Sequence, residues 1–201
     1  MNDAQADLAS RALAVNQANL GIGHEVFADD GARFVRDTRF PRVYDANHVA
    51  DITASTPEEI GRLLARVEAE FTHCRHRKFH TDFTTPPAFE ARLQLEGYQL
   101  SQALVMLLEG DPQGTARPCD IRPVDSDAAW AAFFALHQLD WSEYAARLGK
   151  SEDETAGIDM AQTQVLKSPP VRYWLAYEDG APRGYFNAWE GLDGVGQVEN
   201  L

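Results

Sequence analysis

The sequence predicts an α/β protein that combines helices with a mixed sheet, and three observations lead to this fold class. Helical patterns alternate along the chain with short runs rich in β-branched and aromatic residues. Two Asp–Gly pairs, at residues 30–31 and 179–180, predict hairpin turns because both residue types tolerate positive φ. Residues 110–118 have the proline and glycine content of a linker. We therefore predict two modules, residues 1–115 and residues 116–201.

The first module is predicted to contain three helices. The clearest begins after Thr56, because Pro57, Glu58 and Glu59 supply a proline at the first helical position and acids in the first turn. Gly97 is expected to end the third helix. The predicted elements are a helix over 7–19, a hairpin over 24–27 and 33–36, an extended stretch over 43–52, a helix over 56–72, a strand over 77–83, a helix over 86–95 and a strand over 98–108.

The second module is predicted to place a hairpin at the centre of its sheet. Two apolar strands, over 171–177 and 184–189, are joined through Asp179 and Gly180. Before them we expect a strand over 119–124 and helices over 125–141 and 152–166, and after them a strand that begins at Gln197. The GxxGxG spacing at Gly191, Gly194 and Gly196 lies between two strands, so it predicts a turn and not a phosphate loop.

The composition limits the partners and the compartment. With 31 acidic and 18 basic residues the formal net charge is −13, which disfavours nucleic acid and anionic membranes. The same charge favours cationic or amine-bearing partners, although its first effect is on solubility and it needs no partner to explain it. No apolar run approaches the roughly 20 residues that cross a bilayer. Cys74 and Cys119 have no metal or redox spacing, and no secretory signal is present, so we expect a cytoplasmic protein.

The second module resembles the first half of the GNAT N-acetyltransferase fold. The segment DIRPVDSDAAWAAFFAL (120–136) is similar to that family's opening strand and helix, VRYWLAYEDGAPRGYFNAW (171–189) to its second and third strands, and GVGQVENL (194–201) to the start of its fourth. The first module resembles the other half of the same fold, in PEEIGRLLARVEAEF, HRKFHTDF and PPAFEARLQLEGYQLSQALVMLLEG. The resemblance implies a tandem GNAT-like protein with a degenerate N-terminal module and an incomplete second one.

The resemblance also implies an activity, namely transfer of an acetyl group from acetyl-CoA, as cosubstrate, to a primary amine of a small molecule or peptide. It implies Glu199 as a possible general base, because the amine must lose a proton before it attacks. Asn200 and Leu201 would hold the cofactor, and Trp141, Tyr144 and Trp189 would line the acceptor pocket. No metal is expected.

The sequence departs from the family in one respect. The pyrophosphate loop R/Q-x-x-G-x-G/A, whose backbone N–H groups hold CoA, is not among the 201 residues. We therefore expect either that the working half continues beyond Leu201 or that the chain is truncated, and that the chain alone is inactive.

Two other functions stay open at this point. The chain could be a catalytically inactive GNAT-like protein that binds a ligand or partner, and a homo-oligomer is also open. Less favoured is a metal-binding or structural module built on His73, Cys74, His76 and His80, because their spacing fits no standard tetrahedral site and basic residues lie among them.

Overall fold

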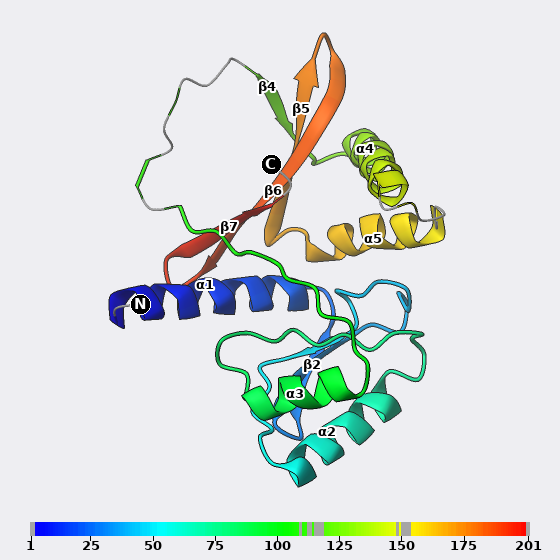
Figure 1. Ribbon diagram of the computed structural model, residues 1–201. Coiled ribbons are helices and arrows are strands. Elements are labelled where there is room, and N and C mark those ends of the chain that lie inside the picture. The colour runs from blue at the N-terminus through cyan, green and yellow to red at the C-terminus, as the bar shows by residue number, and fades with distance from the viewer. Residues whose placement is uncertain are drawn as a thin grey trace. The chain divides into compact units, whose positions relative to one another are not determined.

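The computed structural model describes residues 3–108, 110, 111, 114, 119–147, 149 and 154–199. The chain divides into two compact units, a continuous unit of Leu20–Leu104 and a discontinuous unit of Met1–Asn19 with Val105–Leu201. The elements are α1 (Asp3–Gly21), β1 (Glu25–Asp29), β2 (Ala32–Arg36), β3 (His48–Ala50), α2 (Pro57–Glu70), α3 (Pro87–Leu95), β4 (Asp120–Pro123), α4 (Asp127–Arg147), α5 (Glu154–Lys167), β5 (Val171–Glu178), β6 (Ala181–Leu192) and β7 (Val195–Glu199), as Figure 1 shows.

The continuous unit packs a small antiparallel sheet, ordered β1-β2-β3, against α2 and α3. Helix α2 begins at the predicted N-cap Thr56, and the structure adds a capping box, in which the Glu59 amide donates to Thr56 Oγ1 (3.3 Å) and the Thr56 amide donates to Glu59 Oε2 (3.0 Å). Its apolar face joins Phe34 of β2 and Phe89 of α3 in one buried cluster. This cluster is the core of the unit.

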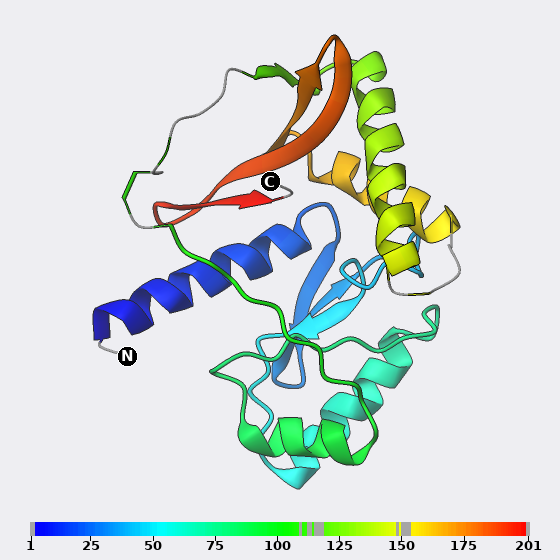
Figure 2. The same cartoon turned by 45° about the horizontal axis from the view of Figure 1, so that its top comes forward.

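The discontinuous unit is built on a four-stranded antiparallel sheet, ordered β4-β5-β6-β7, with the predicted hairpin β5–β6 at its centre. Helices α4 and α5 lie beside this hairpin (Figures 1 and 2). Phe133 of α4 packs its ring edge against Tyr173 of β5 and Tyr185 of β6, with ring centroids 5.4 and 5.0 Å apart. The helices therefore cover the face of the sheet that carries Tyr173 and Tyr185.

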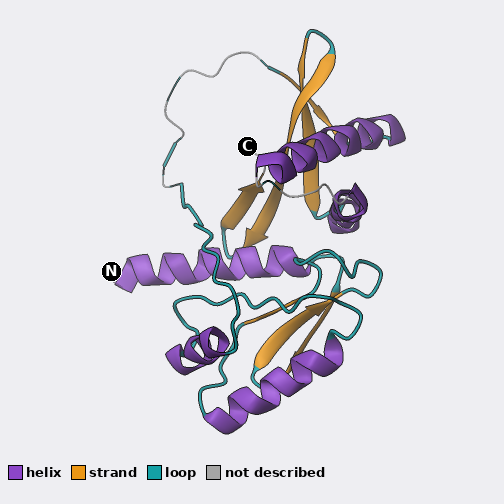
Figure 3. Cartoon of the chain, turned by 45° about the vertical axis from the view of Figure 1, so that its right-hand side comes forward, coloured by secondary structure: helices purple, strands orange, loops and turns teal. Residues whose placement is uncertain are grey.

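The N-terminal helix α1 belongs to this second unit (Figure 3). Gln197 Nε2 donates to Asn16 Oδ1 (3.2 Å), and Lys167 Nζ donates to Asn19 Oδ1 (2.8 Å). Arg11 donates to the backbone carbonyl of Asp193. Three separate contacts thus join α1 to residues of the C-terminal part of the chain, at Lys167, Asp193 and Gln197. The predicted division of the sequence into two modules at residue 115 stays a prediction.

Most predicted elements are confirmed, and three expectations are wrong. Both sheets are antiparallel and not mixed. Residues 77–83 contribute only an isolated bridge between Phe79 and Val49, because their pairing with β3 is limited to two backbone hydrogen bonds, from the Val49 amide to Lys78 (2.9 Å) and from the His80 amide to Val49 (2.8 Å). Residues 98–108 form no strand.

Two further predictions need adjustment. Of residues 43–52 only His48–Ala50 is a strand, because the Asn47 side chain donates to the carbonyls of Phe40 (2.9 Å) and Val43 (3.2 Å) and holds a turn. The predicted linker lies mostly outside the described residues.

Candidate functional site

Three polar side chains form a row across the C-terminal sheet, which we call the polar row. Tyr173 of β5 is paired in register with Asn187 of β6, and Asn187 is paired with Glu199 of β7. Paired residues of antiparallel strands project to the same face, so the three side chains are neighbours on one face. Tyr173 and Asn187 are 3% and 2% exposed, and Glu199 is half-buried. A buried row of this kind is costly unless its groups are used or satisfied.

The Tyr173 hydroxyl is held in this row as a neutral hydrogen-bond donor. It donates to Gln164 Oε1 of α5 at 3.2 Å. Burial, and secondarily the Glu199 carboxylate, raise the pKa of Tyr173 above its ordinary value. The phenol therefore keeps its proton near neutral pH and donates it to Gln164 of α5.

Glu199 is oriented by its neighbour two residues back. Gln197 Nε2 donates to Glu199 Oε1 at 2.7 Å, and the same nitrogen donates to Asn16 of α1. Gln197 Oε1 is buried and has no hydrogen-bond partner among the described residues. A carboxylate and an unused amide oxygen thus lie beside each other, and both accept hydrogen bonds.

A second polar cluster lies on the same face of the sheet, between α4 and β6. The Tyr185 hydroxyl donates to Asp140 Oδ2 at 3.1 Å, and burial, with Asp140 adding to it, raises the pKa of Tyr185. The His137 ring lies 5.9 Å from that of Tyr185 between centroids, and burial lowers the His137 pKa. Tyr185 is two residues from Asn187 on one strand, so this cluster adjoins the polar row.

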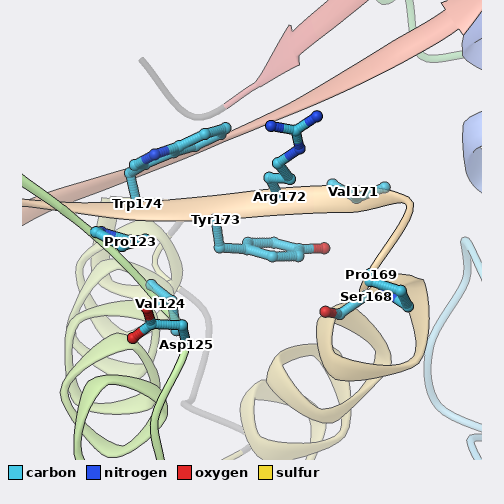
Figure 4. Close-up of a pocket in the computed structure, with 9 residues that line it drawn as sticks. All are labelled: Pro123, Val124, Asp125, Ser168, Pro169, Val171, Arg172, Tyr173 and Trp174. Atoms are coloured by element: carbon cyan, nitrogen blue, oxygen red, sulfur yellow. The ribbon is translucent and has the colours of Figure 1, made fainter.

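A pocket of about 280 Å³ opens beside Tyr173, where β4 ends and α4 departs from the sheet (Figure 4). The Val124 amide donates to the Tyr173 carbonyl at 2.9 Å at this point. The Tyr173 ring lies on the helix side of β5, together with Asp125 and Ser168, whereas Trp174 and Arg172 point to the other face. This volume lies just below the range for small-molecule sites, roughly 300–1,000 Å³.

The structure brings two of the predicted site residues together. Glu199 lies in the polar row, and Trp189 shares its face because it pairs with Gln197. Trp141 packs between α4 and α5, where a Cβ on Gly157 would come within 2.7 Å of its Cδ1 atom. Tyr144 is exposed on α4, with its ring centroid 6.1 Å from that of Trp141. Asn200 and Leu201 lie outside the described residues.

Sequence reasoning did not single out the buried amide Asn187 or the orienting amide Gln197. The sequence held a signal for Asn187. Its strand is apolar and is predicted to lie at the centre of the sheet, and an asparagine is unusual at such a buried position. The second depends on α1, which lies 181 residues away in sequence.

The predicted cluster of His73, Cys74, His76 and His80 does not converge as one metal site. His73 Nε2 donates to Asn47 Oδ1 at 2.9 Å, and the His76 ring stacks on Tyr44 with centroids 3.8 Å apart. Burial raises the pKa of the Cys74 thiol, and Cys74 is free. Within the described part of the chain, no three His, Cys, Asp or Glu side chains are placed to hold a metal ion.

Comparison with known proteins identifies no relative. The chain matches no protein-family model, and it has no significant match among curated proteins or solved structures. None of the helices that the structure describes is long and apolar enough to cross a membrane.

Proposed function

We propose that the discontinuous unit is the acceptor-binding half of a GNAT-type N-acetyltransferase, which transfers an acetyl group from acetyl-CoA to a primary amine of a small molecule or peptide. The observation that carries this proposal is the position of Glu199, at the end of β7, in a polar row and beside the unused Gln197 amide oxygen. Both groups accept hydrogen bonds, and an amine brings N–H groups to donate.

The chemistry asks for one proton acceptor. The ammonium form of the substrate first passes one proton to the Glu199 carboxylate, directly or through water, and becomes the free amine. The amine nitrogen then attacks the thioester carbonyl, a C–N bond forms and the C–S bond breaks. The proton that the nitrogen loses in this step goes to the departing CoA thiolate. Gln197 Oε1 accepts a second N–H, so the nitrogen lone pair points away from both oxygens and toward the thioester.

Two other features support this proposal. From Asp120 on, the order of elements is a strand, two helices, a hairpin and a further strand, which is the order that the resemblance implies. The net charge of −13 attracts amines, which are cationic in solution. Both cysteines are free, which fits a reducing compartment such as the cytosol as the place where the protein would meet its substrates.

Acetyl-CoA binding by these 201 residues is expected to be weak. The sequence has no pyrophosphate loop, whose charge-assisted hydrogen bonds are each worth about 1.5–3 kcal/mol. Losing several of them costs several orders of magnitude in affinity. Calorimetric titration with acetyl-CoA is therefore expected to give no saturable heat below millimolar ligand.

The decisive experiment combines the reading frame beyond Leu201 with an assay of CoA thiol release. We expect an R/Q-x-x-G-x-G/A motif within about 15 residues, acetyl transfer to at least one amine of a panel by the extended chain, and a rate that falls at least about 100-fold in Glu199→Gln. Glu190→Gln, which removes an exposed carboxylate from the same sheet, is the matched control. Micromolar acetyl-CoA binding by the 201 residues, or an extended chain without the motif, contradicts the proposal and favours an inactive binding protein.

A further inference from the structure

Two histidines of the continuous unit form a buried pair that the proposed function does not use. The rings of His48, on β3, and His80 meet edge to face with centroids 4.6 Å apart. His48 is fully buried, and His80 is half-buried. In both rings the Nε2 atom is buried and has no hydrogen-bond partner in the described part of the chain. Buried polar atoms without partners are rare, and an ion or water is a common reason for them.

The protonation of His48 is fixed by the backbone. Its Nδ1 lies 2.8 Å from the Asp45 carbonyl oxygen, which only accepts hydrogen bonds. Nδ1 therefore carries the proton, and Nε2 presents a lone pair. A histidine that ligates a metal has this arrangement, with the far nitrogen donating to a carbonyl or carboxylate that sets the ring.

Both rings are neutral at physiological pH. Burial lowers the pKa of His48 to about 3 and that of His80 to about 4, and the nearby Lys78 ammonium adds to both shifts. Neutral imidazole is the form that binds metal ions, so no proton has to be displaced. Lys78 is itself paired with the Asp45 carboxylate, which offsets part of its charge.

We propose that His48 and His80 form a two-histidine site for a divalent transition ion that prefers imidazole, such as Zn²⁺ or Cu²⁺. No third His, Cys, Asp or Glu is grouped with them among the described residues, so water molecules that enter with the ion would complete its coordination. Nitrogen ligands of this kind suit zinc and copper, and copper binds more tightly in the general order of divalent ions.

The test is calorimetric titration of the metal-stripped chain with Zn²⁺ at pH 7.5. One equivalent is expected to bind and to raise Tm, and His80→Gln, at the half-buried position, is expected to weaken binding at least about tenfold. His76→Gln is the matched control, because His76 also has a buried Nε2 without a partner but stacks on Tyr44 outside the pair. Urea unfolding verifies that each variant is folded.

Two further measurements distinguish a metal ion from a water molecule bound between His48 and His80. Electron paramagnetic resonance of the Cu²⁺ complex is expected to show two imidazole nitrogens, and one nitrogen in His80→Gln. Lys78→Gln removes a positive charge beside both rings and is expected to tighten Zn²⁺ binding severalfold. Unchanged Tm with Zn²⁺, or equal Zn²⁺ affinity in His80→Gln and the parent chain, would overturn the proposal and leave water as the partner of the two rings.

Discussion

The two units use their sheets differently. In the continuous unit, the sheet face toward α2 and α3 is apolar, and Phe34 and Leu63 are fully buried in one cluster. In the discontinuous unit, the face toward the helices buries Asn187 and Tyr173, and the Tyr173 ring packs against those of Trp130 and Phe133. A face that only had to be covered would gain stability from apolar residues. The second unit thus gives up some stability to place polar groups under its helices, which is expected of a site.

The largest effect that distinguishes the units is expected from core truncation. Phe34→Ala removes a fully buried ring from the continuous unit and is expected to lower the free energy of unfolding by about 3–5 kcal/mol. Asn187 is equally buried but lies in the polar row. Asn187→Val is expected to change the free energy of unfolding by less than about 1 kcal/mol, because the substitution removes no aromatic ring from the core and replaces a desolvated amide by an apolar group. Urea unfolding measures both, and a larger loss in Asn187→Val would erase the contrast.

Acid is expected to weaken the continuous unit next. His48 and His80 stay neutral in the folded chain down to pKa values of about 3 and about 4, whereas the unfolded residues take up protons below about pH 6.5. The free energy of unfolding is therefore highest above pH 6.5 and falls as the pH is lowered toward 4, because only the unfolded chain takes up these protons. The decrease is at most about 1.4 kcal/mol per pH unit for each histidine.

Unfolding free energies between pH 7.5 and 4.5 measure this slope, and His80→Gln is expected to make it shallower. Lys78, Asp45 and Arg33 are the charged groups that act on the His80 ring. A slope that His80→Gln leaves unchanged would assign the acid sensitivity to other groups.

A smaller effect is expected at the start of α2. Thr56→Ala removes the hydroxyl that accepts from the Glu59 amide and is expected to cost about 1 kcal/mol. Ser126 is the comparable residue in the other unit, since its hydroxyl accepts from the Ala129 amide at 3.3 Å. Similar losses in Thr56→Ala and Ser126→Ala would show that the units differ in their sheet faces and not in local helix signals.

Local signals made much of the fold predictable. The capping box at Thr56 and the Asp–Gly turns act within a few residues, and Asp30 and Asp179 adopt the positive φ that such turns require. Strand pairing is different, because it depends on a partner far along the chain. Residues 98–108 have strand propensity, but Leu104 and Met106 are exposed and the segment pairs with no described strand.

The site was predictable only in part for the same reason. Glu199 and Trp189 follow from the resemblance and the hairpin pattern, but the register that sets Tyr173 beside Asn187 and Glu199 is a property of the folded sheet. The contact between His48 and His80 likewise joins β3 to a segment distant in sequence, which pairs with β3 only through the isolated bridge between Val49 and Phe79. No spacing in the sequence reports these contacts.

The most direct test of the central claim, that the polar row takes an amine, is a titration of the labelled 201-residue chain with primary amines, followed by NMR. At least one amine is expected to shift the resonances of Tyr173, Asn187 and Glu199 saturably, with affinity falling at least about tenfold in Glu199→Gln, a loss of roughly 1.4 kcal/mol, and unchanged in Glu190→Gln. Saturable shifts that avoid the polar row, or amine binding that Glu199→Gln leaves intact, would contradict the account.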